Sequence, residues 1–197
     1  SPIGAAEVEL EGGERVWWDY RNWRATNHVP AVVGSWPAPF DDAPGPVSVE
    51  CEGAASPCDA VREALASEGV EIAPGAPEKA IRVLVGTWDR LRADPTARLI
   101  EEGPAESGVY AEFISLPPGP RLLGLNEAGE VARRFGADTG LIAATSRYGG
   151  LPVWVVTGAT PAAVRAAAEA LDAEHLRDHY AVAIKDGKST PLPLEGG

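Results

Sequence analysis

Hydroxyl and tryptophan side chains follow three apolar segments, where they can hydrogen-bond to a small ligand or stack on it. AVVGSW at 31–36, VLVGTW at 83–88 and VVTGAT at 155–160 each place glycine and a hydroxyl residue after an apolar run. Ligands of open α/β sheets bind at the carboxyl ends of strands, so we expect these side chains to line one crevice. The candidate ligand-binding residues are Ser35, Trp36, Thr87, Trp88, Thr157 and Thr160. The alternative is plain strand termination, with the indoles packed as core.

Four motifs of known functional centres do not occur in the sequence: the GxSxG elbow, the HExxH pair, the P-loop and the CxxC pair. Asp138-Thr139-Gly140 matches an aspartic-protease tripeptide, but it is also an ordinary turn into a strand. His175 and His179 are four residues apart, which suits either a metal pair or a solvated helix end, and we expect the latter. We therefore predict a protein that is not an enzyme, with no catalytic residue, no metal site and an unknown cofactor.

An aromatic patch lies near the start of the chain and consists of Trp17, Trp18, Tyr20 and Trp23. Such rings can stack on flat ligands or on carbohydrate. They can equally form a buried seam between an opening β-hairpin and the rest of the chain. We expect the seam, because one side of a strand must pack.

Two cysteines, Cys51 and Cys58, lie close together in ECEGAASPCD. Their even number and short spacing predict one disulfide, which indicates an oxidising compartment and hence an extracellular or cell-surface protein. The alternative is a pair of free thiols in a cytosolic protein.

Composition limits the class of protein. The 197 residues include 29 Asp and Glu against 17 Lys and Arg, a net charge of -12, which excludes a surface for wrapping nucleic acid. The hydrophobic share of 45% supports a packed core, and no apolar run is long enough to predict a transmembrane segment. Methionine and glutamine are missing and asparagine is scarce, which fits a thermophile or a GC-rich genome. Since Ser1 takes the place of an initiator methionine, we expect a processed chain.

The elements predicted around these residues are those of an α/β fold, with a mainly parallel open sheet and helices packed on it. A β-hairpin is expected within 1–27, the α/β domain over 28–185 and a flexible tail over 186–197. Strands are predicted at 30–34, 47–51, 80–85, 108–114, 120–125, 139–145, 152–157 and 180–184. Helices are predicted at 58–68, 95–102, 127–135 and 161–172, the last beginning at Thr160-Pro161 with a hydroxyl cap and a first-turn proline.

The opening stretch SPIGAAEVELEGGERVWWDY resembles the end of the β-grasp domain at the carboxyl terminus of transcobalamin and of many bacterial surface proteins. In that family a Gly-Asp-x-Val-x-Trp pattern closes the domain, and Gly13-Glu14-Arg15-Val16-Trp17 matches it with Glu in place of Asp. The rest of the chain is similar to an uncharacterised extension of some bacterial members. The resemblance implies a secreted or surface binding protein, with cobalamin or another small ligand, and places none of the family's binding residues here.

If the hairpin is the end of a β-grasp domain, the strands and helix that should cover it are not in this sequence. Open strand edges favour strand addition, so we expect a partner: the missing amino-terminal half of that domain, or another copy of the same chain. The leading functional expectation is an extracellular, non-enzymatic module for binding or uptake of a small ligand. The alternative is a structural surface protein that self-assembles by strand exchange into an oligomer or a filament.

Overall fold

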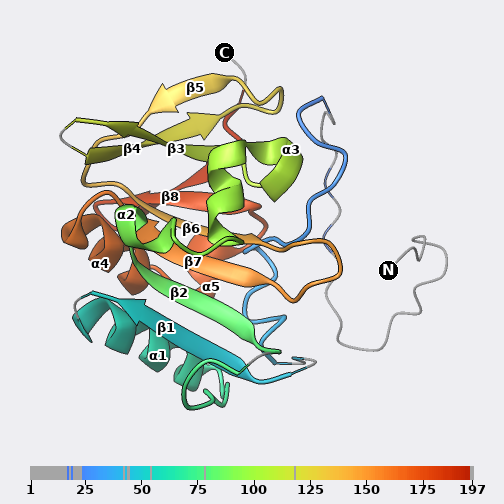
Figure 1. Ribbon diagram of the computed structural model, residues 1–197, viewed down its shortest axis with the longest axis vertical. Helices are drawn as coiled ribbons and strands as arrows, with labels where there is room; N and C mark the ends of the chain where they lie inside the picture. Colours follow the sequence, from blue (N-terminus) through green and yellow to red (C-terminus); the bar gives the residue numbers. More distant parts are fainter. Residues whose placement is uncertain are drawn as a thin grey trace.

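The structure, a computed structural model, describes residues 17, 19, 24–41, 43, 45–53, 55–77, 79–117 and 119–195. These residues form an α/β fold with a six-stranded sheet and a three-stranded sheet (Figure 1). The six-stranded sheet has the order β1-β2-β7-β6-β8-β9. Its strands are β1 (Val47–Glu52), β2 (Ile81–Thr87), β6 (Gly140–Thr145), β7 (Val153–Gly158), β8 (Ala181–Lys185) and β9 (Lys188–Leu192).

Strand directions divide the six-stranded sheet into two halves. β1, β2 and β7 are parallel neighbours, whereas β6 is antiparallel to both β7 and β8, and β9 is antiparallel to β8. The α/β class is confirmed, but the sheet is mixed rather than mainly parallel. Two of the three antiparallel pairs arise because short connections join β6 to β7 and β8 to β9, and such connections make antiparallel pairs.

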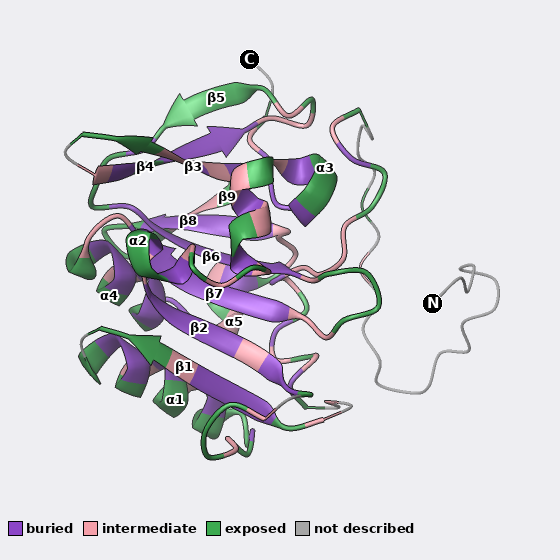
Figure 2. Ribbon diagram, viewed as in Figure 1, coloured by how far each residue is buried: buried purple, intermediate pink, exposed green. Residues whose placement is uncertain are grey.

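Helices α1 (Ala55–Ser67), α4 (Pro161–Glu169) and α5 (Ala173–Leu176) cover one face of the six-stranded sheet (Figure 1). Cys58, Val61 and Leu65 repeat at helical spacing along α1 and are buried against the sheet. β6 and β7 are buried along their whole length (Figure 2), because both faces of these central strands are covered.

The opposite face carries a second core beneath three short helical segments and the small sheet. These elements are α2 (Trp88–Leu91), the 3-10 helix η2 (Ala97–Glu102), α3 (Pro104–Ser107), β3 (Ala111–Leu116), β4 (Gly119–Leu125) and β5 (Val131–Arg134). β3, β4 and β5 are antiparallel neighbours. Trp88, Ile100, Phe113 and Leu122 pack here against Leu84 and Val155 of the large sheet.

Two predicted elements are wrong. Residues 30–34 do not form a strand, because only Val33 and Gly34 donate to the carbonyls of Tyr180 and His179 before the chain turns. Residues 127–135 do not form a helix. Asn126 Oδ1 instead accepts from the N–H groups of Ala128 and Glu130, which closes a turn and directs the following residues into β5.

The carboxyl end also differs from the prediction. The expected flexible tail over 186–197 is wrong for Lys188–Leu192, which form β9 by pairing with β8. Beyond it, the N–H of Leu194 donates to the carbonyl of Leu125, which ties this end of the chain to β4. Backbone pairing from a neighbouring strand therefore orders a segment whose composition is that of a loop.

The β-hairpin predicted within 1–27 falls on residues that lie almost entirely outside the described part of the chain. Within the described residues, no helix combines the length and apolar character needed to cross a bilayer.

Candidate functional site

A cavity of about 240 Å³ lies at the carboxyl ends of the three parallel strands β1, β2 and β7. The strand register brings these ends level, because Glu52 pairs with Gly86 and Thr87 pairs with Gly158. The lining residues come from the strand ends and from the helices that follow them: Glu52, Gly53, Pro57, Val85, Gly86, Thr87, Arg90, Pro161 and Val164. We call this hollow the carboxyl-edge cavity.

Gly86 allows the ends of β1 and β2 to approach each other closely. A Cβ atom at this position would lie 2.6 Å from the backbone oxygen of Glu52. Any side chain would therefore push the two strand ends apart and change the wall of the carboxyl-edge cavity.

Three of the predicted threonines gather at this edge of the sheet, and two of them are already engaged. Thr157 Oγ1 donates to the carbonyl of Gly86 at 2.8 Å and so ties β7 to β2. Thr160 Oγ1 accepts from the N–H of Ala163 at 3.2 Å, which caps α4 and confirms the predicted helix start. Thr87 lines the cavity, and its hydroxyl makes no hydrogen bond to the part of the chain that the structure describes, which leaves it for a ligand.

Two opposite charges line the carboxyl-edge cavity. Glu52 reaches it from the end of β1 and Arg90 from α2, and both residues are exposed. Among the described residues, neither side chain makes an ion pair with the other or with a third residue. Pro57, Val85 and Val164 add apolar surface between them. The cavity therefore offers a cation, an anion, a hydroxyl and an apolar wall.

The structure separates the remaining predicted crevice residues from this cavity. Ser35 and Trp36 lie near the amino end of β7, because the Trp36 ring packs 6.0 Å from that of Trp154 and 5.5 Å from that of Phe40. Ser35 Oγ donates to the carbonyl of Ala38 within its own turn. The expectation that all three Gly-hydroxyl segments form one crevice is wrong, since the first of them does not end a strand.

Trp88 follows β2 directly but turns into the core on the other face of the sheet. Its ring stacks on Phe113 with 4.5 Å between centroids, and its Nε1 donates to Glu101 Oε1 at 2.7 Å. Only 1% of Trp88 is exposed, so this indole does not wall a ligand pocket. Both Trp36 and Trp88 therefore pack as core residues, which is the alternative given in the sequence analysis.

Of the aromatic patch, Trp17 is described and its ring meets Tyr180 edge-on with 5.2 Å between centroids. This contact agrees with a packing seam against the α/β fold. Trp18, Tyr20 and Trp23 lie outside the described residues.

The predicted disulfide is present and joins Cys51 at the end of β1 to Cys58 in α1, with 6.0 Å between their Cα atoms. It therefore closes the short loop that leads from the strand into the helix.

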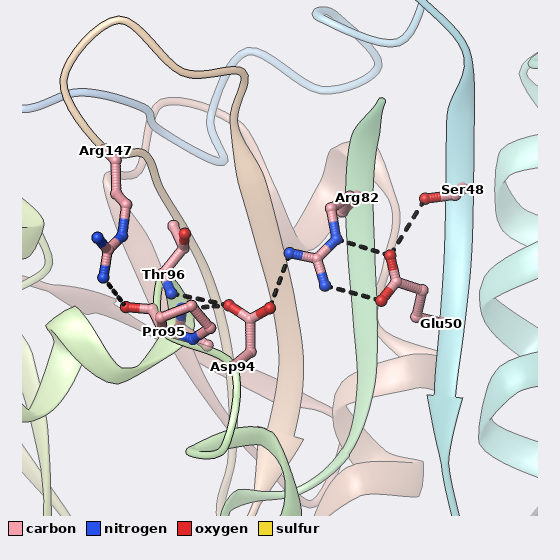
Figure 3. Close-up of polar contacts among 8 residues, drawn as sticks. Ser48, Glu50, Arg82, Asp94, Pro95, Thr96 and Arg147 are labelled. Atoms are coloured by element: carbon pink, nitrogen blue, oxygen red, sulfur yellow. Dashed lines mark hydrogen bonds and ion pairs between the residues drawn. The ribbon is translucent and has the colours of Figure 1, made fainter. Parts of the chain in front are cut away.

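A charged network braces β1 and β2 on the face opposite α1 (Figure 3). Arg82 donates through Nε and Nη2 to both carboxylate oxygens of Glu50, at 2.6 and 2.7 Å. Its Nη1 lies 2.7 Å from Asp94 Oδ2 in the segment after α2. Because the guanidinium is engaged by two carboxylates, we interpret this network as a structural brace rather than a binding site.

The ionisation of Asp94 reflects this network. Burial raises the pKa of Asp94, but hydrogen bonds from the N–H of Ala97, the Arg82 guanidinium and the N–H of Thr96 outweigh it and hold the pKa below its ordinary value. Asp94 is therefore ionised at neutral pH and pairs with Arg82, whose own pKa is raised chiefly by its bond to Glu50.

The two histidines near α5 do not share a helix face, because α5 ends at Leu176 before His179 is reached. His175 Nδ1 instead lies 2.8 Å from the carboxylate of Asp172, the N-cap residue of α5. His179 Nδ1 lies 3.0 Å from the backbone oxygen of Asp178. In the part of the chain that the structure describes, no group of three metal-ligating side chains comes together.

Larger hollows lie on other surfaces. One of about 690 Å³ is lined in part by His28, Glu102, Glu106, Arg147 and the fully exposed Tyr148. It lies between loops and short helices, and Arg147 there already donates to the carbonyl of Pro95 at 2.9 Å. The smaller carboxyl-edge cavity is the stronger candidate, because parallel strand ends converge there and its two opposite charges have no ion partner among the described residues.

Comparison of the chain with models of known protein families gives no match, and comparison with curated proteins gives none.

Proposed function

We propose that this protein is a non-enzymatic binding module that holds a small zwitterionic ligand of amino-acid size in the carboxyl-edge cavity. The observation that carries the proposal is a pair of opposite charges, Glu52 and Arg90, which line one cavity at three parallel strand ends and make no ion pair with any described residue. A cavity at the ends of parallel strands does not by itself specify a ligand, so the ligand class is inferred from the chemistry of the lining residues.

The lining chemistry matches a ligand with two charged groups and an apolar part. Arg90 suits a carboxylate, since its planar guanidinium can donate two parallel hydrogen bonds. Both α1 and α4 begin at this edge, and their amino ends add partial positive charge. Glu52 suits an ammonium group, Thr87 offers a hydroxyl, and Val85 and Val164 suit an aliphatic side chain.

Size favours a ligand much smaller than cobalamin. The cavity of about 240 Å³ lies below the roughly 300–1,000 Å³ that is usual for sites of drug-sized ligands. A corrinoid is larger than such ligands, so the cavity would not enclose it. We therefore propose a free amino acid or a similar zwitterion in place of the cobalamin that the family resemblance implies.

A thermal-shift panel tests the proposal. The probes are the twenty free amino acids, their N-acetylated and amidated forms, inorganic phosphate and cobalamin. We expect at least one free amino acid with an aliphatic side chain to raise the melting temperature. The matching N-acetyl and amide forms should lose the effect, because each removes one charge. No shift with any free amino acid would refute the ligand class.

Variants locate the site. Arg90→Ala and Glu52→Gln should each weaken binding about tenfold or more, the loss expected for one hydrogen bond to a charged group. Arg98→Ala and Glu63→Gln are matched controls, because both side chains are exposed and neither lines the cavity. Val164→Phe should fill the cavity and abolish binding. Equal loss in the controls would place the ligand elsewhere.

For location, we propose export to an oxidising compartment, outside the cell or on its surface. The Cys51–Cys58 disulfide supports this, because structural disulfides persist mainly in such compartments. Self-assembly by strand exchange depends on the opening hairpin, which lies outside the described residues, and we do not propose it.

A further inference from the structure

The disulfide closes a loop that forms part of the wall of the carboxyl-edge cavity. Cys51 and Cys58 enclose residues 52–57, and three of these, Glu52, Gly53 and Pro57, line the cavity. The strand side and the helix side of this wall are thus joined by a bond that a thiol can break.

The two sulfur-bearing residues differ sharply in access. Cys51 is exposed at the end of the edge strand β1, whereas Cys58 is 1% exposed and packs in the core with Val61 and Leu65. Cys51 is therefore the more accessible side of the disulfide for an incoming thiol.

A cation lies beside the accessible sulfur. Arg62 Nη2 is 3.4 Å from Cys51 Sγ, and Nη1 of the same guanidinium contacts Asp59 at 3.3 Å. The guanidinium attracts an approaching thiolate, and positive charge near cysteine promotes exchange in general. Cys58, the leaving sulfur, lies near the amino end of α1, where the helix stabilises negative charge.

We propose that Cys51 Sγ and the Arg62 guanidinium form a thiol–disulfide exchange site for small thiols, and that reduction there loosens the wall of the carboxyl-edge cavity. The effect on ligand binding rests on the proposed function, whereas the exchange chemistry and the loosening do not.

The exchange step is balanced with a dithiol as the reductant. One thiolate of the dithiol attacks Cys51 Sγ, the bond between the two cysteine sulfurs breaks, and the electron pair leaves on Cys58 Sγ. The second thiol of the dithiol then loses its proton and attacks the mixed disulfide. This closes the oxidised ring of the dithiol and releases Cys51 as a thiolate. Two electrons pass from the dithiol to the protein, and each cysteine thiolate takes a proton from water.

Adduct mapping on the folded wild-type protein tests the point of attack. After brief exposure to glutathione and an acid quench, mass spectrometry should find the adduct on Cys51 in at least tenfold excess over Cys58. Equal labelling, an adduct on Cys58, or no reaction without denaturant would overturn the proposal.

The role of the cation has its own test. Arg62→Gln should slow reduction by dithiothreitol about threefold to fivefold, the effect of removing one unit charge at contact distance in a solvated site. Arg165→Gln, another exposed arginine on a helix, is the matched control and should react at the wild-type rate. Equal rates for Arg62→Gln and wild type would overturn the site.

Hydrogen exchange measures the loosening without any ligand. After reduction by dithiothreitol, the backbone N–H groups within residues 52–58, of which Pro57 has none, should exchange at least tenfold faster, while those of β2 and β7 keep their protection. Unchanged exchange at residues 52–58, or an equal loss in β2 and β7, would overturn the local effect. A ligand panel without hits would leave this result standing, so the two proposals fail separately.

Discussion

Replacing Arg82 by methionine tests the brace that holds β1, and with it one wall of the carboxyl-edge cavity. The substitution keeps an unbranched side chain but removes three charge-assisted contacts, two to Glu50 and one to Asp94. The side chains of Arg82, Glu50 and Asp94 are 28%, 25% and 15% exposed, so the two carboxylates would lose their cation in a mostly buried setting.

The expected loss lies between two limits. Breaking a buried ion pair costs about 3–5 kcal/mol, whereas an exposed pair contributes about 0–1 kcal/mol. Asp94 keeps its bonds from the N–H groups of Thr96 and Ala97, and Glu50 is partly open to water, which reduces the loss. We therefore expect Arg82→Met to lower the free energy of unfolding by about 2–3 kcal/mol at pH 7. For a chain of this size that is a drop in melting temperature of roughly 5–10 °C.

The loss should depend on pH in a stated direction. Because the pKa of Asp94 is lowered in the folded state, its stabilising contribution is present above its ordinary value of 3.8 and is lost as pH falls through the lowered pKa. The difference between wild type and Arg82→Met should therefore be smaller at pH 3 than at pH 7. Urea unfolding at both pH values measures it, with Arg98→Met as the exposed control, expected within about 0.5 kcal/mol of wild type. An Arg82→Met value equally close to wild type at pH 7, or a loss that is the same at pH 3, would refute the brace.

Three further substitutions probe the elements around the site. Burial lowers the pKa of His175, but its bond to the N-cap carboxylate of α5 raises the pKa more. The stability that this bond contributes is therefore complete below pH 6.5, and it should fall by about 0.2–1 kcal/mol as pH rises through the raised pKa. His175→Gln should remove that slope in urea unfolding at pH 6 and 8, and an unchanged slope would contradict the assignment. Thr160→Ala should cost about 0.5–2 kcal/mol through loss of the α4 cap, whereas Thr160→Ser should restore most of it in thermal unfolding. Gly86→Ala should cost about 1–3 kcal/mol of unfolding free energy, because the new Cβ meets the backbone of β1. Gly119→Ala is the control and should stay within about 0.5 kcal/mol of wild type, because its Cβ meets nothing within 4 Å. Equal effects of the two substitutions would argue against the close approach.

Elements with strong local signals could be predicted from the sequence. The apolar runs of β1, β2, β7 and β8 and the Thr160-Pro161 start of α4 carry their own information, and the structure confirms them. β5 and β9 could not be predicted in this way. β5 is exposed at all four residues, and β9 contains Pro191, so both depend on hydrogen bonds from a neighbouring strand.

The candidate site was predictable in part for a similar reason. The glycine and threonine residues at the ends of β2 and β7 indicate strand ends, and Thr87 does line the cavity. Glu52 and Arg90 were missed, because strand order alone brings the end of β1 beside α2. The prediction that Trp36 and Trp88 line the crevice is wrong. The direction of each side chain depends on which face of the sheet the following chain covers, and the sequence pattern does not encode that.

The most direct test of the central claim is amide chemical-shift mapping of the ¹⁵N-labelled protein titrated with the free amino acids. A zwitterion held at the carboxyl edge should shift the amides of Gly53, Gly86 and Thr87 in a saturable way, and Arg90→Ala should weaken the response. Shifts that gather instead around Arg147 and Tyr148, or no saturable shift with any amino acid, would contradict a ligand site between the ends of β1, β2 and β7.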